Sequence, residues 1–158
     1  MTSTRTLIRR AVPSDSERLT AIAHAAKARW GYPPAWLELW RDDLTVTPAF
    51  VARQLTLCAD VDGTTAGFAA AVKGALGWEL EHLWVLPAFM GQGVGRDLLS
   101  AMLERLRAVG AESLRIASDP HAVGFYERLG AHLVGEVDSL PLGRRLPVLS
   151  LAVPRSQE

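Results

Sequence analysis

The segment from Trp78 to Leu99, WELEHLWVLPAFMGQGVGRDLL, constrains the fold of this chain more than any other stretch. Its first part has the pattern of a strand up to Pro87, which lacks an N–H group and ends the hydrogen-bonded ladder. Gly91, Gly93 and Gly95 follow on alternate positions, and an amphipathic helix begins behind them. Glycines at such a junction let a ligand approach the backbone, and the helix N-terminus presents N–H groups with a partial positive charge. The segment therefore predicts a phosphate or pyrophosphate site.

Two common phosphate-binding motifs do not match this segment. A dinucleotide-binding turn needs Gly-x-Gly-x-x-Gly, but here the third glycine comes one residue early and Arg96 takes the remaining position. A Walker loop needs Gly-Lys followed by Ser or Thr, which this segment does not contain. Arg96 instead places a fixed positive charge in the first helical turn, which favours an anionic ligand.

The run Val85-Leu86-Pro87, followed by Met90-Gly91-Gln92-Gly93-Val94-Gly95, resembles the acetyl-CoA loop of the GNAT superfamily of N-acetyltransferases. The signature of that loop is Gln/Arg-x-x-Gly-x-Gly/Ala after a strand ending in Val-x-Pro, and Met90 departs from it. Because the phosphate contacts of this loop come mostly from backbone N–H groups, a different side chain at Met90 weakens the match only slightly.

A second motif of the superfamily, Asn-x-x-Ala-x-x-Phe-Tyr-x-x-x-Gly-Phe, recurs further along the chain. The matching residues are Asp119, Ala122, Phe125, Tyr126 and Gly130, with Asp119 in place of the asparagine and Ala131 in place of the last aromatic residue. The resemblance implies that the chain binds acetyl-CoA as co-substrate. The implied coenzyme-binding residues are Leu83, Val85, Met90, Gly91, Gln92, Gly93, Val94, Gly95, Arg96, Asp119, Ala122, Phe125, Tyr126 and Arg128.

Candidate catalytic groups come from the central strand and from the second motif. A free amine must lose a proton before it attacks a thioester, and a carboxylate in a poorly solvated site can take that proton. Glu79 and Glu81 lie two residues apart on one strand, so they share a face, and either is a candidate base or a solvated strand-end carboxylate. His82 faces the other way. Family members often direct the tyrosine at the position of Tyr126 toward the CoA sulfur, so Tyr126 is the candidate acid for the departing thiolate.

The acceptor pocket is harder to predict from the residues. In the fold of this family it is lined by the first two helices and by the loop that joins the last two strands. Trp30, Tyr32 and Trp36, in the region of the two helices, are the candidate substrate-binding residues. An aromatic wall suits a cationic amine, but Trp36 and Trp40 at helical spacing also fit an ordinary buried stripe. No metal site is predicted, and Cys58 is expected to be packed rather than reactive.

The order of elements predicts an α/β fold of the GNAT type, with a single mixed sheet of about seven strands and helices on both faces. Strands are expected at 5–12, 54–61, 66–75, 78–86, 114–117, 131–137 and 146–153. A first helix is expected to begin at a capping box formed by Ser14 and Glu17. Further helices are expected at 34–44, 48–53, 93–109 and 119–130. A single domain is expected over 1–154, with a loose tail at 155–158.

Composition sets limits on partners and location. Seventeen basic residues balance seventeen acidic ones, so no bulk charge favours nucleic acid. The N-terminus has no apolar targeting stretch, no segment is long enough to span a membrane, and a lone cysteine fits a reducing, cytoplasmic location. The expected function is that of an N-acetyltransferase acting on a small-molecule or protein amine. The alternative is a catalytically inactive module that binds CoA or acyl-CoA and acts as a sensor or partner protein. The oligomeric state is left open between a monomer and a homodimer.

Overall fold

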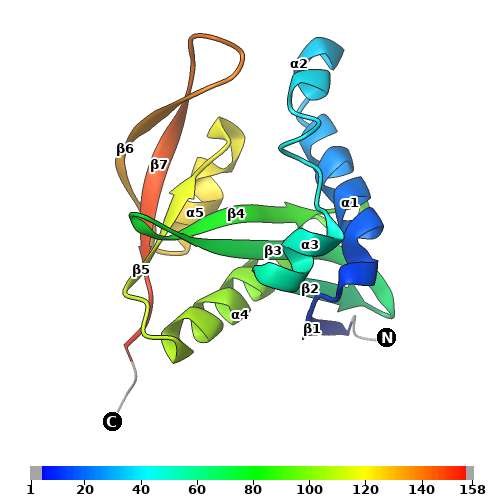
Figure 1. Ribbon diagram of the computed structural model, residues 1–158, viewed down its shortest axis with the longest axis vertical. Coiled ribbons are helices and arrows are strands. Elements are labelled where there is room, and N and C mark those ends of the chain that lie inside the picture. The colour runs from blue at the N-terminus through cyan, green and yellow to red at the C-terminus, as the bar shows by residue number, and fades with distance from the viewer. Residues whose placement is uncertain (1–4, 156–158) are drawn as a thin grey trace. The chain divides into compact units, whose positions relative to one another are not determined.

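The computed structural model describes residues 5–155. Its strands are β1 (Thr6–Arg10), β2 (Leu55–Val61), β3 (Thr64–Gly74), β4 (Gly77–Val85), β5 (Ser113–Ala117), β6 (His132–Ser139) and β7 (Arg144–Ala152) (Figure 1). Its α-helices are α1 (Ser16–Ala28), α2 (Pro34–Leu39), α3 (Pro48–Arg53), α4 (Val94–Ala108) and α5 (Val123–Arg128), and three 3-10 turns are η1 (Pro13–Asp15), η2 (Pro87–Phe89) and η3 (Pro120–Ala122).

The strands form one seven-stranded sheet in the order β1-β2-β3-β4-β5-β7-β6. Strands β4 and β5 pair in parallel, whereas β1 with β2, β2 with β3, β5 with β7 and β6 with β7 pair antiparallel. The predicted mixed sheet with flanking helices is therefore confirmed. The β2–β3 turn falls at Asp62 and Gly63, both with positive φ, as the Asp-Gly pair predicts.

Two helix predictions were too long, and one cap was wrong. The helix expected over 34–44 ends at Leu39 and continues as turns. The helix expected over 119–130 is split into η3 and the shorter α5. The chain enters α1 through η1, and the carboxylate of Asp15 accepts the Val12 N–H group at 2.8 Å, in place of the expected capping box.

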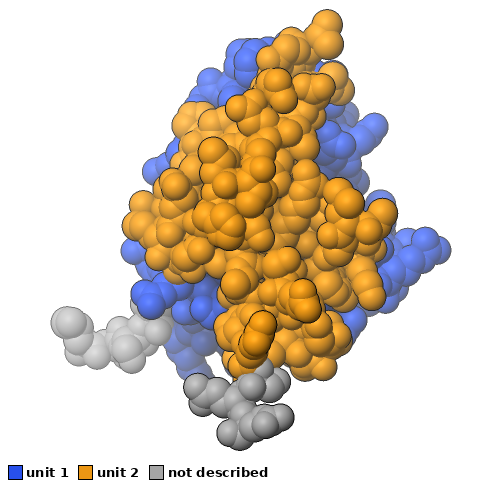
Figure 2. Space-filling view, turned by 90° about the vertical axis from the view of Figure 1, so that its left-hand side faces the viewer, with its two compact units in different colours: residues 1–71, 82–102 blue, residues 72–81, 103–158 orange. Residues whose placement is uncertain are grey.

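The chain separates into two compact units, which Figure 2 distinguishes by colour. Unit 1 contains Met1–Ala71 with His82–Met102, and unit 2 contains Val72–Glu81 with Leu103–Glu158. The expectation of a single domain over 1–154 stays a prediction. Of the tail expected at 155–158, residues 156–158 lie outside the described part of the chain.

Unit 1 packs helices against both faces of its strands. On one face, Leu19 and Ile22 of α1 share a buried cluster with Val51 of α3 and Phe68 of β3. On the other face, a Cβ placed on Gly67 of β3 would lie 3.3 Å from Leu98 of α4 and 2.8 Å from the Trp84 carbonyl oxygen. A glycine is therefore required at this position, where β3 lies against both β4 and α4. This packing fixes α4 behind the end of β4.

Unit 2 is built on the pairing of β5 with β7. Leu114 lies opposite Leu151 and Ile116 opposite Leu149, and all four side chains are buried. Just after β5, the Ser118 N–H group donates to the Pro147 carbonyl oxygen at 2.8 Å. The start of η3 is thereby tied to β7. Within residues 5–155, no helix has the length and apolar character needed to span a membrane.

Candidate functional site

The glycine loop between β4 and α4 has an open backbone. Gly91 and Gly93 have φ of 79° and 83°, a left-handed conformation that favours glycine. A Cβ placed on either residue would meet nothing within 4 Å, and residues 91–93 are exposed. These two glycines are therefore required by backbone conformation, and the space at both Cβ positions is open.

Helix α4 begins directly behind this loop. Gly93 acts as its N-cap, because its carbonyl oxygen accepts the Asp97 N–H group at 3.0 Å. The N–H groups of the first turn, at Val94, Gly95 and Arg96, have no partner within the helix and carry the positive end of its dipole. Val94 is buried and Arg96 is exposed. The loop can therefore bind a pyrophosphate through backbone groups, with a guanidinium beside it.

The candidate bases lie on β4, in the part that belongs to unit 2. Glu79 is about 40% exposed in its side chain and pairs with Arg115 Nη1 at 3.5 Å. Glu81 is exposed as well. Their assignment as a base stays a prediction.

His82, the next residue after Glu81, belongs to unit 1 and is buried. Its Nδ1 atom accepts the Trp84 Nε1–H group at 3.0 Å, and the Phe50 and Phe68 rings lie within 6 Å of the imidazole. Burial lowers the pKa of His82 to about 4. His82 is therefore neutral at physiological pH, with its remaining proton on Nε2.

Tyr126 lies in α5 of unit 2 and is only 7% exposed. Its ring meets that of Phe125 edge-on, with 5.2 Å between the centroids. Burial, and after it the negative charge of Asp119, raises the pKa of the Tyr126 phenol. Tyr126 therefore keeps its proton at neutral pH and can donate a hydrogen bond.

The residues of the second motif lie together in unit 2, in η3 and α5. Asp119 caps η3 by accepting the His121 N–H group at 2.9 Å, and Ala122 ends that turn. Phe125 is half-buried, whereas Arg128 is exposed. Arg144, the first residue of β7, lies 3.6 Å from the carboxylate of Asp119. Sequence reasoning missed Arg144, because nothing in the run SLPLGRR distinguishes it from the neighbouring Arg145.

Two of the three predicted aromatic residues, Tyr32 and Trp36, lie together in unit 1, and Trp40 lies with them. The rings of Tyr32 and Trp36 stack with 5.8 Å between centroids, and Tyr32 meets Trp40 edge-on. The Lys27 ammonium lies 4.5 Å from the Trp40 centroid and 5.0 Å from that of Tyr32. Trp30 lies just beyond α1, with the Arg29 guanidinium 5.9 Å from its ring. The faces of Tyr32 and Trp40 are therefore already in contact with a cationic side chain, that of Lys27.

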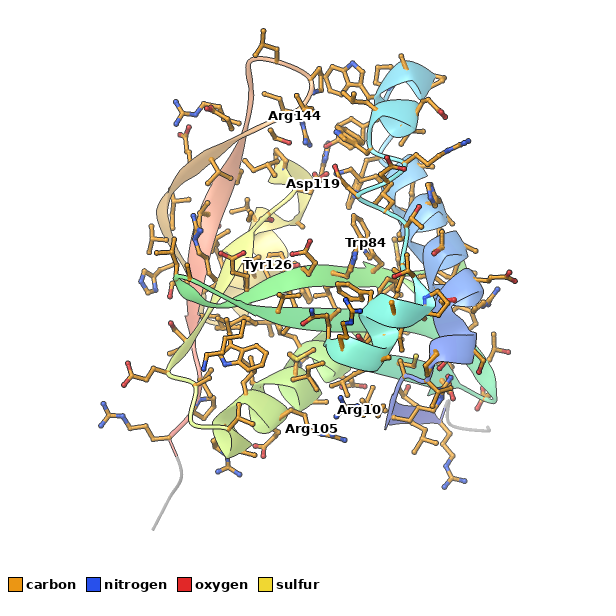
Figure 3. All side chains as sticks on the ribbon, in the orientation of Figure 1. Arg10, Trp84, Arg105, Asp119, Tyr126 and Arg144 are labelled. Atoms are coloured by element: carbon orange, nitrogen blue, oxygen red, sulfur yellow. The ribbon has the colours of Figure 1, made fainter. Side chains whose placement is uncertain are left out.

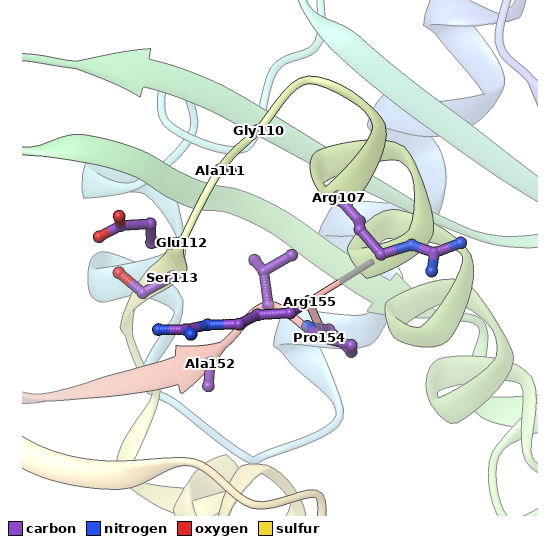
Figure 4. A pocket seen from close by; sticks show the side chains of 9 residues that line it. Arg107, Gly110, Ala111, Glu112, Ser113, Ala152, Pro154 and Arg155 are labelled. Atoms are coloured by element: carbon purple, nitrogen blue, oxygen red, sulfur yellow. The ribbon is translucent and has the colours of Figure 1, made fainter. Parts of the chain in front are cut away.

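A surface groove of about 710 Å³ lies in unit 2, around the connection from α4 to β5 (Figure 4). Its lining includes Arg107, Glu112 and Arg155, and none of the predicted site residues. In Figure 4 the guanidinium groups of Arg107 and Arg155 point in opposite directions, so they do not converge on one anion. We therefore assign this groove no ligand.

The sequence of this chain was compared with models of known protein families. The model of the acetyltransferase (GNAT) family matches residues 18–131. This chain belongs to the acetyltransferase (GNAT) family. The match includes both the glycine loop and the Tyr126 segment, and it confirms the resemblance that the two motifs indicate.

Solved structures share the GNAT fold along almost the whole chain. PaiA N-acetyltransferase from Thermoplasma acidophilum, in complex with coenzyme A, is 19% identical with a TM-score of 0.78, and the match covers 94% of this chain and 99% of that one. A GCN5-related N-acetyltransferase from Rhodopseudomonas palustris is 24% identical with a TM-score of 0.77, covering 96% and 98%. YncA from Salmonella typhimurium, solved with acetyl-CoA, is 19% identical with a TM-score of 0.68, covering 98% and 97%. Comparison with curated protein sequences gave no match.

Proposed function

We propose that this chain is an acetyl-CoA-dependent N-acetyltransferase that moves the acetyl group directly onto a primary amine of a small molecule or a protein. The observation that carries the proposal is the open glycine loop at the N-terminus of α4, in a chain of the acetyltransferase family. Two structural neighbours solved with coenzyme A or acetyl-CoA support the choice of co-substrate.

The loop supplies the binding energy for the coenzyme in this proposal. The N–H groups between Gly91 and Arg96 bind the pyrophosphate, and the Arg96 guanidinium adds a charge-assisted contact. Leu83 and Val85 of β4 lie beside the acyl end, and Met90 and Gln92 lie at the edge of the loop. In unit 2, we propose that Asp119, Ala122, Phe125 and Arg128 add further contacts. Binding through backbone groups explains why Met90 is acceptable in place of the usual Gln or Arg.

The transfer requires two protons to leave the amine nitrogen and one proton to reach the sulfur. Glu79 or Glu81 takes a proton from the ammonium of the acceptor, directly or through water. The free amine attacks the thioester carbonyl carbon, so that a C–N bond forms and the C–S bond breaks. As the C–S bond breaks, Tyr126 donates its proton to the departing sulfur and takes the second proton that leaves the attacking nitrogen. The products are an amide and the CoA thiol. The proton held by the carboxylate returns to solvent.

The environment of Tyr126 determines how much this residue contributes to the rate of acetyl transfer. A raised pKa keeps the phenol protonated, but it also makes the phenol a weaker acid than free tyrosine. We therefore expect Tyr126 to act mainly by donating a strong hydrogen bond as charge develops on sulfur. Its contribution falls near the lower end of the range for general acids, at about 100-fold.

We propose that Trp30, Tyr32 and Trp36 form one wall of the acceptor pocket. The Lys27 ammonium already lies against the faces of Tyr32 and Trp40. We therefore expect this wall to contact the apolar part of an acceptor rather than its ammonium group.

Acetyl-CoA should protect the protein against heat in proportion to the logarithm of its concentration. A ligand that binds only the folded state adds about 2.7 kcal/mol at 100 times its Kd. Acetyl-pantetheine, which has the thioester but lacks the pyrophosphate, serves as the matched control and should protect far less. Equal protection by the two compounds would contradict binding through the glycine loop.

Release of thiol from acetyl-CoA, measured across a panel of amines, tests the reaction itself. The panel includes polyamines, amino acids, aminoglycosides and peptides with a free N-terminus or lysine. Thiol release that depends on the amine, together with a new amide detected by mass spectrometry, is the expected result. Tight acetyl-CoA binding with no release for any amine would contradict the enzyme and leave only coenzyme binding.

Replacement of Cys58 by Ala should leave turnover within about twofold of the parent, apart from some loss of stability through the small cavity. The thiol is fully buried, and burial raises its pKa to about 12, so it is not a nucleophile at neutral pH. Steady-state turnover of the folded variant is the measurement. A folded variant without turnover, combined with a radiolabelled acetyl group trapped on the parent, would instead show a cysteine intermediate.

A further inference from the structure

Asp119 places a negative charge where the second family motif has a neutral asparagine. Its side chain is only 9% exposed, and it accepts the His121 N–H group at 2.9 Å. The His121 Nδ1 atom lies 2.8 Å from the same carboxylate oxygen. An asparagine could make the same capping contact without the charge. The charge therefore calls for an explanation beyond capping.

Arg144 places a guanidinium against this carboxylate. Its Nη2 atom lies 3.6 Å from Asp119 Oδ2, and its side chain is 12% exposed. A further contact, from Nη1 to the Ser139 hydroxyl at 3.4 Å, holds the guanidinium across the connection from β6 to β7. Because both partners are largely buried, the pair is screened much less than a surface ion pair.

The charge of Asp119 acts on Tyr126. Asp119 precedes η3, which leads directly into α5, and Figure 3 shows Asp119 between Arg144 and Tyr126 in this view. The Asp119 charge is one of the two causes that raise the pKa of the Tyr126 phenol. An uncompensated charge there would make Tyr126 a still weaker donor to a developing thiolate. The guanidinium of Arg144, 3.6 Å from the Asp119 carboxylate, is in position to offset that charge.

We propose that Arg144 is a positioning residue of the acetyl transfer, which holds and neutralises the Asp119 carboxylate beside Tyr126. The inference rests on the proposed function, because Tyr126 is assigned there as the donor to sulfur. It links the start of β7 to the chemistry at sulfur, although Arg144 itself need not touch either substrate.

Arg144→Met should lower kcat by about 3- to 10-fold, because the Asp119 charge left without its guanidinium partner makes Tyr126 a weaker donor to sulfur. The loss should shrink with acyl donors whose thiol is a better leaving group. Arg144→Lys, which keeps the charge, should recover most of the rate. Arg145→Met is the matched control, since Arg145 is 59% exposed and pairs only at the surface with Glu136 and Asp138, and it should keep the parent rate.

A double-mutant cycle separates electrostatics from simple loss of structure. In an Asp119→Asn background the charge that Arg144 offsets is gone, so adding Arg144→Met should cost less than about twofold. An equal cost of Arg144→Met in both backgrounds, or a loss that is the same for all acyl donors, would overturn the proposal. The proposed function fails separately, if the parent releases no thiol from acetyl-CoA with any amine.

Discussion

Replacing Tyr126 with Phe is expected to lower kcat by about 100-fold, with a much smaller change in acetyl-CoA affinity. The substitution removes one oxygen and keeps the ring that packs in α5, so the fold should survive. The affinity should be little affected because the proposed phosphate contacts lie in residues 91–96. Steady-state kinetics and direct binding of acetyl-CoA to the variant measure the two quantities.

A series of acyl donors with thiols of different acidity makes this test specific. A better leaving thiol needs less stabilisation, so the ratio of parent to variant rates should fall along the series. Tyr32→Phe, which removes the hydroxyl group of the chain's other tyrosine, is the control. Its rate should depend on the acidity of the leaving thiol in the same way as the parent's rate. If parent and Tyr126→Phe respond alike, Tyr126 only packs in the helix, and the thiolate leaves unaided or takes its proton from water.

Features encoded by neighbouring residues could be predicted from the sequence. Thr47 followed by Pro48 predicted a short helix, and α3 has those bounds, with the Thr47 hydroxyl accepting the Phe50 N–H group at 3.0 Å. The glycine loop also depends on local rules, since left-handed φ at Gly91 and Gly93 restricts the choice of residue. The seven strands were predicted for the same reason, because their alternation and bounding turns are local signals.

Features that depend on partners distant in sequence could not be predicted. Trp36, Trp40 and Leu44 have helical spacing, but the chain leaves the helix at Leu39 and buries Trp40 and Leu44 from turns instead. At the entry to α1, Asp15 replaces the predicted cap because Arg9 holds its carboxylate at 2.9 Å and lowers its pKa. Arg9 in turn is fixed by Asp60 on the neighbouring strand.

The same limit applies to the candidate site. The aromatic residues fit either a surface for a cationic amine or an ordinary buried stripe. Only the fold shows that Trp40 is buried and that the Lys27 ammonium from α1 lies against its ring. Asp119 was visible as a departure from the motif, whereas its partner Arg144 comes from β7, 25 positions away, and no local pattern links the two. The motifs therefore identified candidate residues, whereas their contacts with distant parts of the chain became visible only in the tertiary structure.

Gly93→Asp should weaken acetyl-CoA binding by about 100-fold or more. A residue with a Cβ costs roughly 1–2 kcal/mol at the left-handed φ of Gly93, and a carboxylate there repels the pyrophosphate. Because Gly93 is exposed and a Cβ would meet nothing within 4 Å, the free protein should still fold. Isothermal titration of acetyl-CoA measures the loss, and a thermal melt without ligand checks the fold.

Gly93→Asn separates the two causes, because asparagine has nearly the shape of aspartate, tolerates a positive φ and carries no charge. We expect the Asn variant to lose about tenfold, so that the remaining loss in the Asp variant reports repulsion. That remaining difference should shrink as salt is raised, since the exposed charges are screened over about 8 Å at physiological ionic strength. If both variants bind acetyl-CoA as tightly as the parent, the phosphates are held elsewhere. If they weaken binding equally at every salt concentration, the loop acts through its conformation alone, and no anion lies against the N-terminus of α4.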